Sequence, residues 1–171
     1  MRFAFLAFLG FITMASHGAL SAMLEIGTVQ IRATAPGMDV TGGYVAITNH
    51  GNSDDTLVAA SASFAKRVEL HEMTHDNGVM KMRRRGDGIG IPAGETVLMK
   101  PGGLHIMFMG LKETLQPGEM REITLEFASG QRMTMPAMVL KPGDIKAGGL
   151  GHSHDESDGH FGGNKHKHSH D

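Results

Sequence analysis

The chain contains no cysteine among its 171 residues. A blue-copper centre, a thiolate zinc site and a cysteine nucleophile are therefore excluded, because each depends on a thiolate. Attachment of a lipid at a cysteine is excluded for the same reason. No disulfide can form either, so any folded domain in this chain must rely on its hydrophobic core.

The sequence also lacks a strong charge imbalance and lacks catalytic motifs. The formal net charge of -2 gives no reason to expect nucleic acid or an anionic membrane surface as a partner. The basic run Arg83–Arg85 is short and is most simply a solvated strand end. No Ser/His/Asp spacing, glycine-rich phosphate loop or paired-carboxylate motif is present, which favours a binding protein over an enzyme.

The N-terminal apolar segment is too short to span a membrane. Arg2 precedes an almost unbroken apolar run from Phe3 to Met14, whereas a spanning helix needs about 20 residues. Small residues follow between Ala15 and Ala22. This layout is typical of a secretory signal, so we predict a signal peptide over residues 1–22 and a periplasmic mature protein with no stable membrane insertion. A retained membrane anchor is the alternative.

Between residues 24 and 140, no window shows a convincing 3.6-residue period. Short runs of strand-forming residues are instead separated by turn signals at roughly ten-residue spacing. The predicted strands are Leu24–Ala33, Gly43–Asn49, Thr56–Ala60, Lys66–Met73, Val79–Arg85, Thr96–Lys100, Leu104–Leu111, Met120–Phe127 and Gln131–Leu140. The segment Asp76–Gly78 predicts a hairpin turn. We therefore expect an all-β fold, an antiparallel β-sandwich or barrel, over residues 23–141.

Alternation along two of these strands separates apolar residues from His and Met. One face of the strand at 104–111 carries aliphatic and aromatic side chains, and the other carries His105, Met107 and Met109. In the strand at 66–73, His71 and Met73 lie opposite the aliphatic face. This pattern favours an exposed or rim site over simple core filling.

Four of the His and Met residues make a soft, mostly neutral ligand set. His71 is followed after ten residues by Met82, and after twenty-two more by His105 and Met107. Alternate residues on a strand project to one face about 7 Å apart, so His105 and Met107 can chelate one ion. Two imidazoles and two thioethers fit Cu(I) best, because polarizable sulfur favours a soft monovalent ion. Zinc seldom accepts Met, and Mg or Ca prefers oxygen.

Several neighbouring residues have weaker claims to a metal. Met fills irregular gaps in cores, so any single one of the 14 methionines is more simply a packing residue. Met73, Met80 and Met109 share the predicted ligand face and can line the site or offer a second relay position. His75 and His50 are most simply exposed loop residues. Glu72 points to the opposite face from His71 and is assigned no role.

These residues resemble the signature of the periplasmic copper chaperones called PCu(A)C, H-x10-M-x21/22-H-x-M. The segments "VELHEM", "GVMKMR", "IPAGETVLMKPGGLHIMFMGL" and "GYVAITN" also resemble the family, over roughly residues 24–140. The resemblance implies a cupredoxin-like, Greek-key β-sandwich that binds one Cu(I) through His71, Met82, His105 and Met107. It also implies delivery of copper to cytochrome c oxidase, towards the CuA centre of subunit II. A periplasmic copper buffering or resistance protein without a dedicated acceptor is the alternative.

The C-terminal segment, residues 142–171, is a second possible metal site. It is rich in Gly, His, Asp, Ser and Lys, and too poor in apolar residues to offset the entropy of ordering, so we expect disorder. Its six histidines are His152, His154, His160, His166, His168 and His170. Such tracts bind borderline metals, with Cu(II) favoured over Ni(II) and Zn(II). A solvated tail with incidental metal affinity is the alternative.

Overall fold

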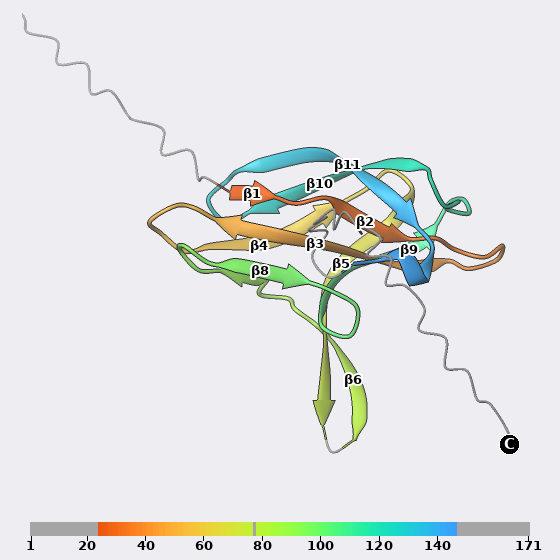
Figure 1. The fold of residues 1–171 in the computed structure, drawn as a ribbon, viewed down its shortest axis with the longest axis horizontal. Helices are drawn as coiled ribbons and strands as arrows, with labels where there is room; N and C mark the ends of the chain where they lie inside the picture. Colours follow the sequence, from red (N-terminus) through yellow and green to blue (C-terminus); the bar gives the residue numbers. More distant parts are fainter. Residues whose placement is uncertain (1–23, 77, 147–171) are drawn as a thin grey trace, which may run out of the picture.

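Short β-strands account for nearly all regular structure in the computed structural model, which describes residues 24–76 and 78–146 (Figure 1). One 3-10 helix, η1, follows the last strand. The elements are β1 (Leu24–Ile26), β2 (Val29–Arg32), β3 (Val40–Asn49), β4 (Asp55–Ser61), β5 (Ala65–Asp76), β6 (Val79–Arg84), β7 (Ile89–Ile91), β8 (Thr96–Met99), β9 (Leu104–Leu111), β10 (Met120–Phe127), β11 (Arg132–Leu140) and η1 (Pro142–Asp144).

The strands form one continuous sheet that folds over on itself. Their order is β6-β5-β9-β3-β2-β11-β10-β4-β7, and β1 and β8 both pair with β3. Residues from distant positions in this order, such as Leu57 in β4, Ile91 in β7 and Phe108 in β9, pack into the same core. The predicted cupredoxin-like β-sandwich is confirmed. One pair, β2 with β11, is parallel, so the sandwich is not purely antiparallel as expected.

Strand β9 shows how the sequence creates a core face and a site face. Ile106 and Phe108 have no exposed surface, whereas Met107 and Met109 alternate with them on the other face and are partly exposed. Phe108 packs closely against β3, because a Cβ added at Gly43 would lie 2.7 Å from its Cε2 atom. Glycine at position 43 therefore leaves room for the Phe108 ring, so that β3 can lie directly against β9, the strand that carries His105 and Met107.

Strands β5 and β6 form a hairpin whose outer half extends away from the rest of the sandwich (Figure 1). Asp76 pairs directly with Val79, which leaves a two-residue connection, and Gly78 has the positive φ of 79° that such a turn requires. The predicted hairpin is confirmed. Because the turn is so short, His75 lies within β5 and not in the loop where we expected it.

The structure differs from the expectation at three other places. Leu24–Ala33 is interrupted near Gly27 and forms two strands, and β7 was not predicted because only three residues form it. The segment expected to be disordered from residue 142 begins with η1, and the Lys146 amide donates a hydrogen bond to Gln30 Oε1 at 2.9 Å.

Two predicted segments lie largely outside the described residues. The signal peptide at 1–22 and the tail from residue 147 onwards are not among them. Within residues 24–76 and 78–146, no helix is long and apolar enough to cross a membrane. The domain limits proposed from the sequence remain a prediction.

Candidate metal site

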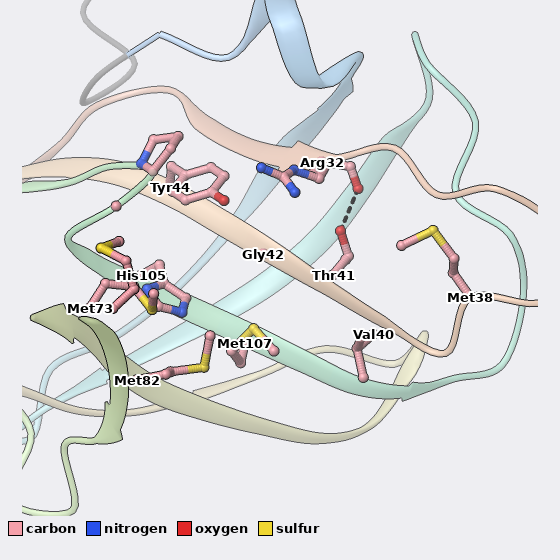
Figure 2. A pocket seen from close by; sticks show the side chains of 13 residues that line it. Arg32, Met38, Val40, Thr41, Gly42, Tyr44, Met73, Met82, His105 and Met107 are labelled. Atoms are coloured by element: carbon pink, nitrogen blue, oxygen red, sulfur yellow. Dashed lines mark hydrogen bonds between the residues drawn. The ribbon is translucent and has the colours of Figure 1, made fainter. Parts of the chain in front are cut away.

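A hollow of about 360 Å³ opens where β3, β9 and the β5–β6 hairpin meet. Its wall is mostly apolar and rich in sulfur. The residues that line it are Arg32, Met38, Val40, Thr41, Gly42, Tyr44, Met73, Met80, Met82, Pro101, Gly102, His105 and Met107. Figure 2 shows His105, Met73, Met82 and Met107 gathered at one end of this hollow, with Met38 and Val40 at the other.

The register of the sheet explains why these side chains meet. His71 in β5 pairs with His105 in β9, and Met73 pairs with Met82 in β6. Directly paired residues in an antiparallel ladder project to the same face, with Cβ atoms about 5 Å apart, and successive rows are about 7 Å apart. The two histidines therefore form one row, and Met73 with Met82 forms the next row towards the tip of the hairpin.

His105 is buried and already oriented. It is 5% exposed, and its Nδ1 donates a hydrogen bond to the Gly103 carbonyl at 2.9 Å. A neutral imidazole carries one proton, so Nε2 retains its lone pair. Burial lowers the pKa of His105 below its ordinary value, the hydrogen bond to Gly103 opposes that change, and His71 adds to the lowering. The neutral, metal-binding form of His105 is thus favoured.

His71 lies beside His105 but does not line the hollow. The two ring centroids are 5.9 Å apart, and the His71 side chain is 13% exposed. Its Nε2 lies 2.9 Å from Glu69 Oε2, while its Nδ1 is buried with no hydrogen-bond partner. The hydrogen bond from His71 lowers the pKa of the Glu69 carboxyl; burial opposes this, and Arg67 and Arg84 lower it further.

The methionines give the site an accessible side. Met82 and Met80 in β6 are 49% and 46% exposed. Met107 and Met73 are partly buried on the strands behind them. Among the described residues, no three His, Asp or Glu side chains converge closely enough to hold a metal ion, so a metal site here needs thioether ligands. Thioethers and neutral imidazoles together suit a soft ion.

The other residues singled out from the sequence lie inside the hollow, away from it, or outside the described residues. Met73 and Met80 line the hollow as considered, whereas Met109 does not and instead lies 3.4 Å from an Arg67 nitrogen. His50 is exposed and pairs with Glu25 at 2.7 Å. The six tail histidines lie outside the described residues.

The sequence reasoning missed two features of the site. Glu69 was not singled out, although its position two residues before His71 on a strand already places both side chains on one face. Tyr44 and Arg32 also line the hollow. Arg32 lies in β2, which pairs with β3, and Tyr44 lies in β3, which pairs with β9; only the fold reveals these pairings.

Comparison with known proteins gives consistent matches. The profile described as "Putative lipoprotein LpqE-like" matches residues 24–139. The Leifsonia xyli subsp. xyli (strain CTCB07) protein Lxx21020, described as a lipoprotein in the same way, is 35% identical over 116 residues, 68% of this chain and 68% of that protein.

Solved structures share the fold. The apo PCuAC domain from PmoF1 superposes with a TM-score of 0.59 at 23% identity, over 70% of this chain and 94% of that domain. CuI-DR1885 from Deinococcus radiodurans has a TM-score of 0.56 at 30% identity, over 75% of this chain and 84% of its own. The sequence match over the whole sandwich and the shared architecture agree: this chain belongs to the LpqE-like family and has the fold of PCuAC domains.

Proposed function

We propose that this protein is a periplasmic copper metallochaperone that binds one Cu(I) through His71, Met82, His105 and Met107. The observation that carries the proposal is that His105, whose Nε2 holds the lone pair, lines the same sulfur-rich hollow as Met82 and Met107. His71 adjoins this group through its contact with the His105 ring.

The chemistry of the ligand set suits a carrier. Thioethers stay neutral at any pH and cannot form disulfides, so they remain available in an oxidising compartment. A site without thiolate holds Cu(I) less tightly than one with it, which permits transfer. Four protein ligands leave no open position for a substrate, and this argues against an enzyme. Met82, half-exposed at the rim, offers the side from which an acceptor can approach.

The similarity to CuI-DR1885, at 30% identity, supports copper as the cargo. The lipoprotein description of the family and of the Leifsonia relative supports an exported, envelope-associated location. This chain has no cysteine to acylate within its 171 residues, so its own export rests on the signal peptide predicted from the sequence.

A competitive Cu(I) titration of the mature protein against a chromophoric chelator, under reducing conditions, tests the site. We expect one tight equivalent that is lost in His105→Ala and in Met107→Leu. Met109→Leu is the matched control, because Met109 lies on the same face of β9 but outside the hollow. Tight binding that survives in both site variants would refute the assignment.

We further propose that the acceptor is the CuA centre of cytochrome c oxidase subunit II. A copper-buffering or resistance protein with the same site, but without an acceptor, is the second candidate. The two differ in one measurable property: a chaperone loads copper into the soluble CuA domain faster than free Cu(I) at the same buffered activity does. Equal loading rates would favour the buffering function.

A further inference from the structure

One carboxylate lies within an otherwise soft and neutral ligand cluster. Glu69 faces the same side of β5 as His71 and pairs in register with Met107 of β9. Its side chain is only 14% exposed, so it is not simply a solvated surface residue. A carboxylate is also a poor ligand for Cu(I), so direct binding of the metal does not explain its position.

The hydrogen bonds of Glu69 determine which nitrogen of His71 carries the proton. An ionised carboxylate only accepts, so the 2.9 Å contact requires His71 Nε2 to donate to Glu69 Oε2. The lone pair of the neutral ring is then on Nδ1. That atom is buried and has no partner, and leaving a buried polar atom unpaired costs free energy. A bound metal ion would remove that cost.

The same reasoning gives the opposite result for His105. There the backbone carbonyl of Gly103 accepts from Nδ1, so Nε2 holds the lone pair. The two histidines, paired directly across β5 and β9, therefore carry their lone pairs on different ring nitrogens.

Two arginines fix the carboxylate in this orientation. Arg67 Nε lies 3.2 Å and Arg84 Nε 3.8 Å from Glu69 Oε1, which leaves Oε2 for His71. The guanidinium groups also offset the negative charge, so the carboxylate adds little attraction for harder, more highly charged ions. Carboxylates that accept a hydrogen bond from a metal-bound histidine orient the ring and raise its basicity.

From this geometry we infer that Glu69 is a positioning residue for the copper site: it holds His71 so that Nδ1 binds the ion, while His105 binds through Nε2. The inference rests on the proposed copper site and specifies how its two imidazoles are used. Glu69 itself does not contact the metal.

Imidazole nitrogen NMR of 15N-histidine-labelled protein, which Cu(I) permits because it is diamagnetic, tests the inference directly. In the metal-free protein we expect His71 as the Nε2–H tautomer and His105 as the Nδ1–H tautomer. Addition of Cu(I) should then shift Nδ1 of His71 and Nε2 of His105. A metal-free His71 protonated at Nδ1, or a copper-induced shift at its Nε2, would overturn the inference.

Variants separate positioning from simple structural support. Glu69→Ala should abolish the tautomer preference of His71 and weaken Cu(I) binding by about 10- to 100-fold, the usual cost of losing such a partner. Glu69→Gln keeps an accepting oxygen, so it should keep the tautomer and lose less affinity. Glu72→Ala and Glu72→Gln are the matched controls, since Glu72 lies on the same strand but its carboxylate pairs with Arg85 and not with His71.

The outcomes distinguish this inference from the proposed function. If the wild-type protein binds one Cu(I) that Met107→Leu abolishes, and Glu69→Ala binds as tightly as wild type, only the role of Glu69 is refuted. If the wild-type protein shows no tight Cu(I) site, the proposed function fails, whatever tautomer His71 adopts. The tautomer assignment needs no copper and remains decisive even if Glu69→Ala does not fold.

Discussion

The body of the sandwich and the β5–β6 hairpin contribute unlike halves of the proposed copper site. In β9, an inner strand between β5 and β3, His105 is buried and held by Gly103, and Ile106 and Phe108 fill the opposite, core-facing side. In β6, at the edge, every residue is exposed, including Met82. One half is fixed by a packed core, and the other has little packing to restrain it.

This difference suits an ion that must be held and then released. Ligands on a packed strand stay in place, whereas regions with few buried apolar contacts open at lower free-energy cost. We therefore expect His105 and Met107 to determine where copper sits, and Met82 to determine how readily it leaves. The predictions that follow test this division.

Core substitution should have the largest effect. Phe108→Ala removes a side chain with no exposed surface and should lower the free energy of unfolding by about 3–5 kcal/mol. Met80→Ala, in the hairpin, should change it by no more than about 0.5 kcal/mol. Denaturant-induced unfolding of the metal-free protein measures both. Similar losses for the two variants would mean that the hairpin is packed as firmly as the body.

The two proposed thioether ligands should contribute differently to Cu(I) affinity. Met107→Leu should remove tight Cu(I) binding, whereas Met82→Leu should weaken it by about tenfold, or about 1.4 kcal/mol, and speed release to a chelator. Met120→Leu is the control, because Met120 is similarly exposed but lies outside the hollow. Chelator competition and stopped-flow release measure these effects. A greater loss for Met82→Leu than for Met107→Leu would reverse the assignment of roles.

Acidification should destabilise the fold through the buried His105. Because burial lowers the pKa of His105, the unfolded chain takes up the proton more readily than the folded one. Stability is therefore full above about pH 6.5 and declines as pH falls from there through the lowered pKa. The melting temperature of the metal-free protein should follow this course, and His105→Gln should flatten it. His75→Gln, on the exposed hairpin, is the control and should leave the slope unchanged.

The same proton competes with copper. Histidine must be neutral to bind, so Cu(I) affinity should weaken below about pH 6.5. The lowered pKa of His105 should keep its Nε2 available to a lower pH than an exposed histidine would allow. A flat affinity from neutral to mildly acidic pH would indicate that the thioethers alone hold the ion.

Removal of residues 146–171 should have the smallest effect on the core site. We propose that the six tail histidines capture Cu(II) and raise its local concentration near the sandwich. The truncated protein should lose Cu(II) binding and keep Cu(I) affinity within about twofold, a difference worth about 0.4 kcal/mol. Cu(II) binding that persists after truncation would refute the proposal for the tail.

The strands were predictable because they depend on local periodicity. The four candidate ligands remain a prediction, although three of them, Met82, His105 and Met107, line one hollow and His71 lies beside His105. Alternation in Leu104–Leu111 separated the core face from the site face, and β9 has those bounds in the structure. The surroundings of Glu69 were not predictable in the same way. Its hydrogen bond to His71 is local, but its burial and its contact with Arg84 depend on how β5, β6 and β9 come together.

The parallel pairing of β2 with β11 and the three-residue strand β7 were missed for a related reason. The parallel pairing has no local signal, because β2 and β11 are far apart in the sequence and meet only in the folded sheet. Strand β7, with three residues, is too short to show a periodic pattern. The hairpin turn was predictable, yet its tightness moved His75 from an expected loop into β5.

Among the described strands, β6 lies at the end of the sheet, and its outer edge has a consequence for self-association. An unpaired, partly apolar edge strand is a template onto which another chain can add. Here Val79, Met80 and Met82 share the strand with Lys81, Arg83 and Arg84, so a second copy laid along this edge would place two basic strands side by side. The basic run thus disfavours edge-to-edge aggregation of the protein with itself, while Met82 remains open to a molecule of different charge.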